Sequence, residues 1–464
     1  MAARVENRLD DGMLSLRLSA GRLMALVGTL LAVSLILASS AEAEQRPDVV
    51  LIVLDDARAD LLSAATAPII TRKLAGRGVS FSHAMVPVSL CCPSRTSTLT
   101  GMYSHSTGVY SGGIDAFSDD RRTVPVWLHK AGYRTGLFGK YLNGYGKGEF
   151  RGYLPPGWDR WAAFRRPGFR SFDWVDRHGG VHRGRGYSTR ILARAAGRFI
   201  KTTPDRKPLF VYFAPYAVHA PAEPEARDAG TFGDLERWRP PSYNVDPIDQ
   251  PPYLSRDWPR ELRDSTDAFR IAQHETMRSA DRAVGAIMKA MARAGRMRDT
   301  LFILLSDNGI QWGEHRLKGK SVPYDASTHI PLIVRYDTAA WSGVRHGVVA
   351  NIDIAPTIAD VAGVAHPSVE GRSLVDSLET GGEVRRFLLV EHAMRPAGGV
   401  PSYCGVRSPR YLFVHYADGF EEVYDYKVDP WELDNIAADR PGLTTNLRTE
   451  AMALCDPVPP RFSW

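Results

Sequence analysis

Four runs of apolar, largely β-branched residues constrain the fold of this chain more than any other feature. Each run is continuous rather than alternating, which is typical of a strand buried on both faces of a sheet. Between them lie stretches, such as residues 268–294, whose apolar residues recur at helical spacing. This alternation predicts an α/β fold, a mostly parallel sheet with helices on both faces. The four runs are Asp48–Leu54, Leu209–Ala214, 300–305 and Leu332–Tyr336.

Polar groups follow three of these four runs. Asp55-Asp56 comes after the first run, His219 lies shortly after the second, and Asp307-Asn308 follows the third. Any one of these groups could cap a helix or form a turn. Ligands of parallel sheets bind beyond the carboxyl ends of the strands, so three such ends together predict a functional site at that edge.

Composition excludes several classes of protein. Of the 464 residues, 44% are hydrophobic and 24% are charged, which excludes a disordered chain and a polytopic membrane protein. A count of 4 Cys excludes a scaffold held by disulfides. The net charge is +6, and residues 147–190 hold ten Lys and Arg against four Asp and Glu. This stretch is either a solvated basic surface or a field that attracts an anionic substrate. No nucleic-acid-binding motif accompanies it, so we expect no nucleic acid partner.

Residues 1–43 are predicted to be an export signal. Arg17 and Arg22 precede an uncharged, mostly apolar run at residues 23–38. Ala41-Glu42-Ala43 fits the small-residue cleavage pattern, with Glu44 as the first mature residue. An uncleaved N-terminal anchor is the alternative. In both cases the folded part lies outside the cytoplasm, as a secreted, periplasmic or cell-surface protein, and we expect no stable membrane partner.

The C-terminal part has a different pattern. Residues 411–416 and 422–426 are short, alternating and aromatic, and Asp418-Gly419 separates them, which predicts a β-hairpin. We therefore expect a catalytic domain at 44–380 and a smaller antiparallel α+β subdomain at 381–464. Cys404 and Cys455 are the only cysteines outside positions 91 and 92, and in an exported protein they are predicted to form a disulfide.

Residues 90–101, LCCPSRTSTLTG, form the most informative segment. A helix that begins here places Cys91 and Arg95 on one face, and Pro93 suits its first turn. The helix N-terminus and Arg95 together would attract an anion, and they would acidify Cys91 and make it reactive. From local physics alone, a buried pair of cysteines at the start of a helix is an equal alternative.

This segment resembles the signature of the type I sulfatases, C-x-P-S-R-x-x-x-L-T-G. The resemblance extends from Arg46 to about Asn435. It implies an alkaline-phosphatase-like fold and the activity of a sulfuric ester hydrolase. It also implies that a formylglycine-generating enzyme converts Cys91 to Cα-formylglycine during maturation. Further matching motifs are Gly139-Lys140-Tyr141-Leu142-Asn143, His219-Ala220-Pro221, Asp307-Asn308-Gly309 and Gly313-Glu314-His315-Arg316.

The resemblance assigns roles to the motif residues. The aldehyde hydrate at position 91 would attack the sulfate ester with one hydroxyl, and the other would collapse to expel sulfate. A divalent cation would be held by an oxygen-rich set that suits Ca²⁺ first and Mg²⁺ second. Many arylsulfatases have a histidine where this chain has Leu142, so the base for sulfate elimination stays unassigned. The implied metal ligands are Asp55, Asp56, Cys91, Asp307 and Asn308; the catalytic residues are Cys91, Arg95, Lys140, His219 and Lys320; the substrate-binding residues are Lys140, His219, His315 and Lys320.

Three motifs narrow the substrate. The segments 139–143 (GKYLN), 153–158 (YLPPGW) and 241–244 (PSYN) resemble N-acetylglucosamine-6-sulfatases and extracellular heparan 6-O-endosulfatases. We therefore expect 6-O-sulfated N-acetylglucosamine or a related glycan as substrate. One alternative is an arylsulfatase that acts on small sulfate esters, and another is an inactive sulfatase-like protein that binds glycans. A phosphate or phosphonate monoesterase with two zinc ions would need His ligands and a Ser or Thr nucleophile, which the matching positions lack.

Overall fold

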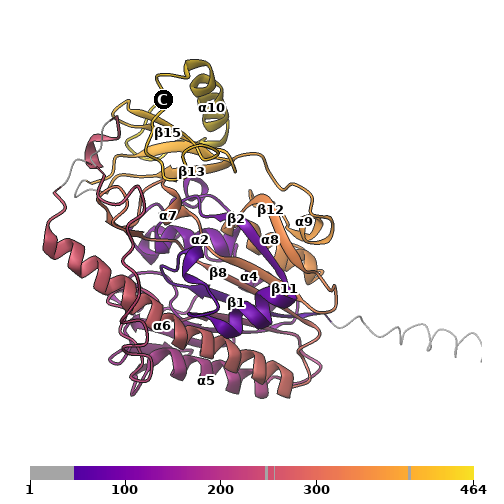
Figure 1. Cartoon of the computed structure of the whole chain (residues 1–464). Helices are drawn as coiled ribbons and strands as arrows, with labels where there is room; N and C mark the ends of the chain where they lie inside the picture. The colour runs from indigo at the N-terminus through magenta and orange to yellow at the C-terminus, as the bar shows by residue number, and fades with distance from the viewer. Residues whose placement is uncertain (1–45, 246–248, 255–256, 396–398) are drawn as a thin grey trace, which may run out of the picture. The chain divides into compact units, whose positions relative to one another are not determined.

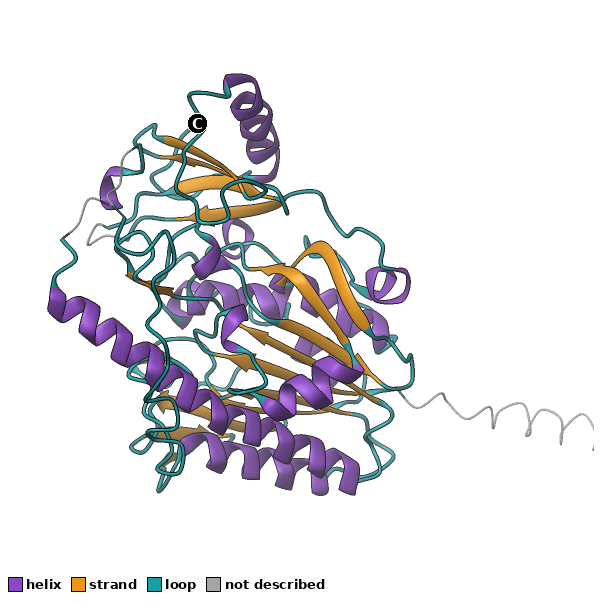
Figure 2. Ribbon diagram, viewed as in Figure 1, coloured by secondary structure: helices purple, strands orange, loops and turns teal. Residues whose placement is uncertain are grey.

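A ten-stranded mixed sheet runs through the computed structural model (Figures 1 and 2), which describes residues 46–245, 249–254, 257–395 and 399–464. The predicted signal segment, residues 1–43, lies outside the described residues. The strand order is β12-β2-β11-β8-β1-β7-β3-β4-β5-β6. In chain order the strands are β1 (Asp48–Leu54), β2 (Val79–Met85), β3 (Arg134–Gly139), β4 (Arg160–Arg166), β5 (Asp173–Asp176), β6 (Val181–Arg183), β7 (Leu209–Ala214), β8 (Thr300–Ser306), β11 (Leu332–Tyr336) and β12 (Gly343–Ala350).

The middle of the sheet is parallel. β8, β1, β7, β3 and β4 lie side by side and run in one direction, which confirms the predicted α/β fold. The expected fourth strand, β11, instead runs antiparallel to β8. Residues 307–331 connect these two strands through the ribbon of β9 (Gln311–Trp312) and β10 (Lys318–Gly319) and the short helix α7 (Asp325–Thr328). None of these elements crosses the sheet as a parallel connection requires, so the chain re-enters from the same edge.

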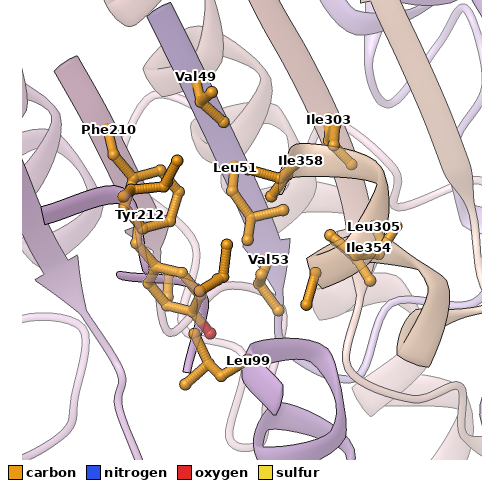
Figure 3. Packing of buried hydrophobic residues seen from close by; sticks show 14 of the residues in the cluster. Val49, Leu51, Val53, Leu99, Phe210, Tyr212, Ile303, Leu305, Ile354 and Ile358 are labelled. Carbon is orange, nitrogen blue, oxygen red and sulfur yellow. The ribbon is translucent and has the colours of Figure 1, made fainter. Parts of the chain in front are cut away.

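Helices cover both faces of the sheet, as predicted. One face carries α2 (Cys91–Thr100), α4 (Val124–Lys130) and α8 (Ile354–Val361), and the other carries α5 (Ser188–Lys201) and α6 (Arg260–Arg293). The odd-numbered residues of β1 pack with Leu99 of α2 and with Ile354 and Ile358 of α8 (Figure 3). The even-numbered residues of β1 belong to a second cluster with Met277 and Val284 of α6. This arrangement explains the continuous apolar run, because side chains along a strand alternate between the two faces.

The C-terminal region forms a separate antiparallel sheet in the order β13-β14-β15-β16. The predicted hairpin is confirmed by the pairing of β15 with β16. The predicted disulfide is also confirmed: Cys404 of β14 bonds to Cys455 at the end of α10, with 6.3 Å between their Cα atoms. The strands are β13 (Leu388–His392), β14 (Tyr403–Arg407), β15 (Tyr411–Tyr416) and β16 (Glu421–Asp425), and the remaining α-helices are α3 (Ser104–Thr107), α9 (Val375–Thr380) and α10 (Pro441–Leu454).

Among the residues that the structure describes, no helix combines the length and the apolar character that a membrane span requires.

Candidate active site

Two acidic strand ends meet at the carboxyl edge of the sheet. Leu54 of β1 lies opposite Ser306 of β8, so the parallel register brings the next residues of both strands together. The backbone N–H of Asp56 donates to Asp307 Oδ1 at 3.1 Å, and Asn308 Nδ2 donates to Asp56 Oδ1 at 2.7 Å. Asp56 adopts a left-handed φ of 61°, which turns the chain directly after the strand. The four polar side chains at this edge are all buried: Asp55, Asp56, Asp307 and Asn308.

Cys91 faces these carboxylates from the first position of α2. Its Sγ lies 3.7 Å from Asp55 Oδ1 and 3.8 Å from Asp56 Oδ1. The helix begins at Cys91 with Pro93 in its first turn, as predicted.

The sequence predicted a lowered pKa for the thiol of Cys91, and this prediction is wrong. Burial raises the pKa of Cys91 to about 12, although Lys140 and Lys320 act in the opposite direction. A thiolate in a fully buried position loses more hydration than nearby cations restore. The unmodified thiol is therefore a poor nucleophile at neutral pH.

Three cations balance the buried carboxylates. Lys140 Nζ donates to Asp55 at 2.9 and 2.8 Å, while Lys320 Nζ donates to Asp56 and lies 2.7 Å from Cys91 Sγ. Arg95 Nε donates to Asp307 Oδ2 at 2.8 Å. Burial opposes charge at both aspartates of the pair, but the facing cations hold the pKa values of Asp55 and Asp56 below their ordinary range. Both partners of the Lys140–Asp55 pair and of the Lys320–Asp56 pair are thus charged.

Gly139 explains how Lys140 reaches this site. Its φ of 126° is open to glycine, and a Cβ at this position would lie 1.9 Å from the carbonyl oxygen of Ala214. A larger residue here would push β3 away from β7. The glycine of the Gly-Lys motif therefore allows β3 to end close against β7, with the lysine directed to Asp55.

His219 enters the site from the loop after β7. Its Nδ1 donates to the carbonyl oxygen of Ala220 at 2.7 Å, and its Nε2 lies 3.7 Å from Asp56 Oδ2. The ring stacks on Tyr216 with 4.7 Å between centroids, and the side chain is 26% exposed. His219 is thus the group of this cluster that faces both the carboxylates and solvent.

The cluster has the donor atoms for a hard divalent cation. One ligand atom each from Asp55, Asp56, Cys91 and His219 lies within 4.8 Å of the others. The side-chain oxygen of Asn308 is buried and accepts no hydrogen bond from any described group. A buried amide oxygen without a donor is costly, and a cation would satisfy it. His219 was expected to contact substrate, and its place in this group was not anticipated.

His315 lies apart from these residues. It stacks on Tyr324 with 4.4 Å between ring centroids, and its Nε2 lies 3.6 Å from Glu432 Oε2. The ring is almost fully buried. The structure therefore brings together the other expected site residues and places His315 beside the C-terminal sheet: the residues brought together are Asp55, Asp56, Cys91, Arg95, Lys140, His219, Asp307, Asn308 and Lys320.

Gln273 supports this site, although no sequence motif pointed to it. From α6, its Nε2 donates to the carbonyl oxygens of Asp56 at 3.2 Å and Val218 at 3.1 Å. Its Oε1 accepts from Trp312 Nε1 at 2.6 Å. One amide thus joins the two loops that carry Asp56 and His219. The available signal was a glutamine at the helical spacing of the buried residues Phe269 and Met277.

Two family models match the chain. The model described as Sulfatase matches residues 47–364, and the model described as N-sulphoglucosamine sulphohydrolase, C-terminal, matches residues 313–452. The chain belongs to the sulfatase family. Its members are sulfuric ester hydrolases, and the chain is assigned to that class of enzyme, as the sequence predicted.

Named relatives support the expected branch of the sulfatase family. Human N-acetylglucosamine-6-sulfatase is 30% identical over 454 residues, which cover 85% of this chain and 81% of that protein. The extracellular sulfatase SULF-1 homolog of Drosophila melanogaster is 29% identical over 364 residues, 73% of this chain. The chain spans 32% of the length of that Drosophila protein. The resemblance to the type I sulfatases near the N-acetylglucosamine-6-sulfatase branch is confirmed.

A solved structure supports the fold. The structure of BT4656 in complex with its substrate D-glucosamine-2-N,6-O-disulfate matches with a TM-score of 0.76 and 24% identity. The match covers 88% of this chain and 97% of that chain. It confirms the alkaline-phosphatase-like sulfatase fold.

Proposed function

We propose that this chain hydrolyses sulfate monoesters of glycans, with 6-O-sulfated N-acetylglucosamine or a related sugar as substrate. The observation that carries the proposal is the buried meeting of Cys91 with the Asp55-Asp56 pair and with Lys140 and Lys320. A sulfate monoester is an anion, and its hydrolysis develops further negative charge. Buried, oriented cations stabilise such charge far better than water does.

Modification of Cys91 fits the environment of this residue. As Cα-formylglycine, made by a formylglycine-generating enzyme, position 91 would supply a hydrate that attacks sulfur and afterwards expels sulfate. The raised pKa of the thiol argues against direct attack by sulfur. The environment of residue 91 therefore supports the formylglycine hydrate, and not the cysteine thiol, as the nucleophile.

We propose Ca²⁺ as the cation, with Mg²⁺ as the second choice. Asp55, Asp56, Asp307 and Asn308 would hold it through oxygen atoms, together with residue 91. When bound, a divalent cation polarises a sulfate oxygen. The oxygen-rich donors and the unsatisfied Asn308 Oδ1 favour a hard cation over zinc.

The remaining residues would bind sulfate and move a proton. Lys140 and Lys320 carry positive charge next to position 91 and would neutralise the bound sulfate. Nδ1 of His219 donates to a carbonyl oxygen, so Nε2 is the nitrogen that would exchange a proton with the substrate. As an imidazolium, His219 would pass the proton on Nε2 to the leaving oxygen and return to the neutral ring. Arg95 would add positive charge while it holds Asp307. For His315, which stacks on Tyr324, we propose a positioning role toward the segment that carries Lys320 in place of direct contact with substrate.

The glycan assignment rests on the relatives and on the basic stretch 147–190. Within that stretch, Arg165 and Arg166 share one carboxylate, Asp173, at 3.2 and 3.4 Å. Two guanidinium groups against one carboxylate leave positive charge for the sulfate of a neighbouring sugar. A change of both to Ala should therefore lower kcat/KM for a sugar sulfate more than for an aryl sulfate.

The test compares two neighbouring cysteines in protein made together with a formylglycine-generating enzyme. Cys91→Ala should abolish hydrolysis of N-acetylglucosamine 6-sulfate, while the matched control Cys92→Ala should keep it. Mass spectrometry of the peptide that contains residues 91–95 should show formylglycine at 91 and cysteine at 92. Active enzyme with unmodified Cys91 would contradict the mechanism.

Other outcomes identify the alternatives. Hydrolysis of aryl sulfates alone would indicate an arylsulfatase. Binding of sulfated glycans without turnover would indicate an inactive sulfatase-like protein. Two bound zinc ions and phosphate or phosphonate ester hydrolysis would indicate the monoesterase.

We also propose that the chain is exported by its first 43 residues, that residues 44–380 form the catalytic domain and that residues 381–464 form a smaller antiparallel subdomain. The extracellular Drosophila homolog supports export. The separate four-stranded sheet that begins at Leu388 supports the boundary.

A further inference from the structure

A groove of about 780 Å³ lies between α5 and α6, which cover the same face of the sheet (Figure 1). Small residues of both helices line it, among them Ala193, Gly197, Ala283 and Ala290. A Cβ on Gly197 would lie 3.8 Å from the Cβ of Ala290, so the helices approach closely where these residues meet. Short side chains keep the surface between the two helices open and apolar.

Cations line this groove far more densely than acids. Arg190, Arg194, Arg198 and Lys201 recur every three or four residues along α5, so they share one face of the helix. Further basic residues come from α6 and from Arg227. In total eight cations and two carboxylates line the groove.

Five of these cations are not needed for internal ion pairs. Glu225 pairs with Arg190, Arg227 and Arg282 at 2.8, 2.7 and 3.0 Å. Within the part of the chain that the structure describes, the other five side chains have no ion-pair partner: Arg194, Arg198, Lys201, Lys289 and Arg293. Along α5 the unpaired part of the stripe, from Arg194 to Lys201, spans about 10 Å at the rise of an α-helix. Such a row of free positive charge is available to an external anion.

One end of the groove is connected to the candidate active site. Tyr187, which lines the groove, contacts Phe169, and Phe169 contacts Tyr216, with ring centroids 6.0 and 5.2 Å apart. Tyr216 in turn stacks on His219. A short path of aromatic rings therefore leads from the groove to the histidine that faces the carboxylates. Phe169 and Tyr187 are buried, so these contacts run through the interior and place the Tyr187 end of the groove near the edge of the sheet that carries the site.

We infer that this groove is a second binding site, for a linear polyanionic glycan such as a sulfated oligosaccharide, which it holds while one sugar occupies the candidate active site. The inference rests on the proposed glycan substrate. A ligand with a single anionic head would satisfy one or two of the five free cations, whereas repeated sulfates would satisfy the whole row. The planar guanidinium fork suits sulfate oxygens, and the small apolar floor suits the C–H faces of sugar rings.

The experiment measures binding without turnover. In a Cys91→Ala background, a fluorescent heparin octasaccharide is titrated against the protein with and without Arg194→Glu/Lys289→Glu. Both side chains are exposed, so folding should be unaffected, and circular dichroism checks this. We expect the groove variant to raise Kd about tenfold or more, with a smaller ratio at high salt. The control Lys130→Glu/Lys427→Glu changes the net charge equally at exposed sites outside the groove and should leave Kd nearly unchanged.

A comparison of kcat/KM for two substrates distinguishes this inference from the proposed function. With Cys91 intact, the groove variant should lower kcat/KM for a sulfated octasaccharide about tenfold and leave that for N-acetylglucosamine 6-sulfate unchanged. Equal octasaccharide binding by the groove and control variants would overturn the inference, even if glycan sulfates are hydrolysed. Groove-dependent binding without any hydrolysis would support the inference and refute the proposed function. Loss of binding to phosphatidylglycerol vesicles, with octasaccharide binding intact, would overturn it in favour of a lipid surface.

Discussion

Burial sets the chemical properties of the key single residues in this molecule. Cys91 lies at a helix N-terminus near three cations, a setting that normally acidifies a thiol, yet burial raises its pKa. Gln273 shows the opposite case, in which a buried polar group is fully satisfied. Its amide makes three hydrogen bonds and holds the loops of Asp56 and Val218. Its removal should therefore affect both stability and the site.

We expect Gln273→Leu to lower the free energy of unfolding by about 1–3 kcal/mol, because two buried carbonyl oxygens lose their donor. It should also weaken Ca²⁺ binding, since Asp56 would lose its support. Met288→Leu, a buried change on the same helix, is the matched control and should alter neither quantity strongly. Chemical denaturation and calcium titration are the measurements. Unchanged calcium affinity would leave Gln273 with a structural role alone.

At the scale of secondary-structure elements, the buried carboxyl group of Glu422 links the C-terminal sheet to the segment before α7. Glu422 of β16 accepts hydrogen bonds from Tyr416 of β15 and Tyr424 of β16, at 2.6 and 2.9 Å. It also accepts from Tyr324, just before α7, at 3.1 Å. Burial raises the pKa of Glu422 to about 7. This contact therefore couples the docking of the sheet to pH.

The sign of this coupling follows from linkage. Glu422 binds its proton more tightly in the folded chain, so its contribution to stability is complete below pH 4.5 and is lost as pH rises toward about 7. Across this pH range, the free energy of unfolding of Glu422→Gln should rise by about 3 kcal/mol relative to that of the wild type, because the amide stays neutral. Denaturation at several pH values measures the difference. Glu450→Gln, at an exposed position, should show no such trend. A constant difference between Glu422→Gln and wild type would contradict the assignment.

The disulfide acts on the same region. Cys404 and Cys455 are 51 residues apart in the sequence, and closing a loop of that length stabilises the folded chain by about 4 kcal/mol in the chain-entropy model. Cys404→Ala/Cys455→Ala should therefore unfold at a lower denaturant concentration than the wild type. A reductant should shift the wild type in the same direction and leave the double variant unchanged. A wild type that is insensitive to reductant under unfolding conditions would refute this contribution.

At the scale of the whole molecule, the candidate site joins segments that are far apart in the sequence. Asp55 and Asp56 follow β1, Asp307 and Asn308 follow β8, and Cys91 begins α2. A cation bound among them would cross-link these segments in the folded chain and would find no such site in the unfolded chain. Its binding should therefore stabilise the entire molecule.

We expect Ca²⁺ at 100 times its Kd to raise the free energy of unfolding by about 2.7 kcal/mol, and a chelator to reverse the effect. Asn308→Ala should reduce this increment, because it removes the buried oxygen that has no donor. Asp234→Asn, at an exposed position, should keep the full increment. A calorimetric melt with and without Ca²⁺ measures it. Stabilisation by zinc and not by Ca²⁺ would contradict the proposed cation.

The central strands, the helix at Cys91 and most residues of the candidate site were predictable from the sequence. Continuous apolar runs predicted the central strands because both faces of those strands are buried, and C-x-P-S-R predicted the helix that begins at Cys91. The two cysteines outside positions 91 and 92 predicted the disulfide. These features are local, or they depend on motifs whose spacing is visible along the chain.

Five other properties depend on tertiary packing: the direction of β11, the neighbours of His315, the pKa of Cys91, the role of Gln273 and the groove between α5 and α6. Strand direction depends on how a connection crosses the sheet, and a pKa depends on every atom that displaces water around the group. A groove exists only where two helices, distant in the sequence, pack through small residues. Such properties arise from packing between remote segments, which no local pattern contains.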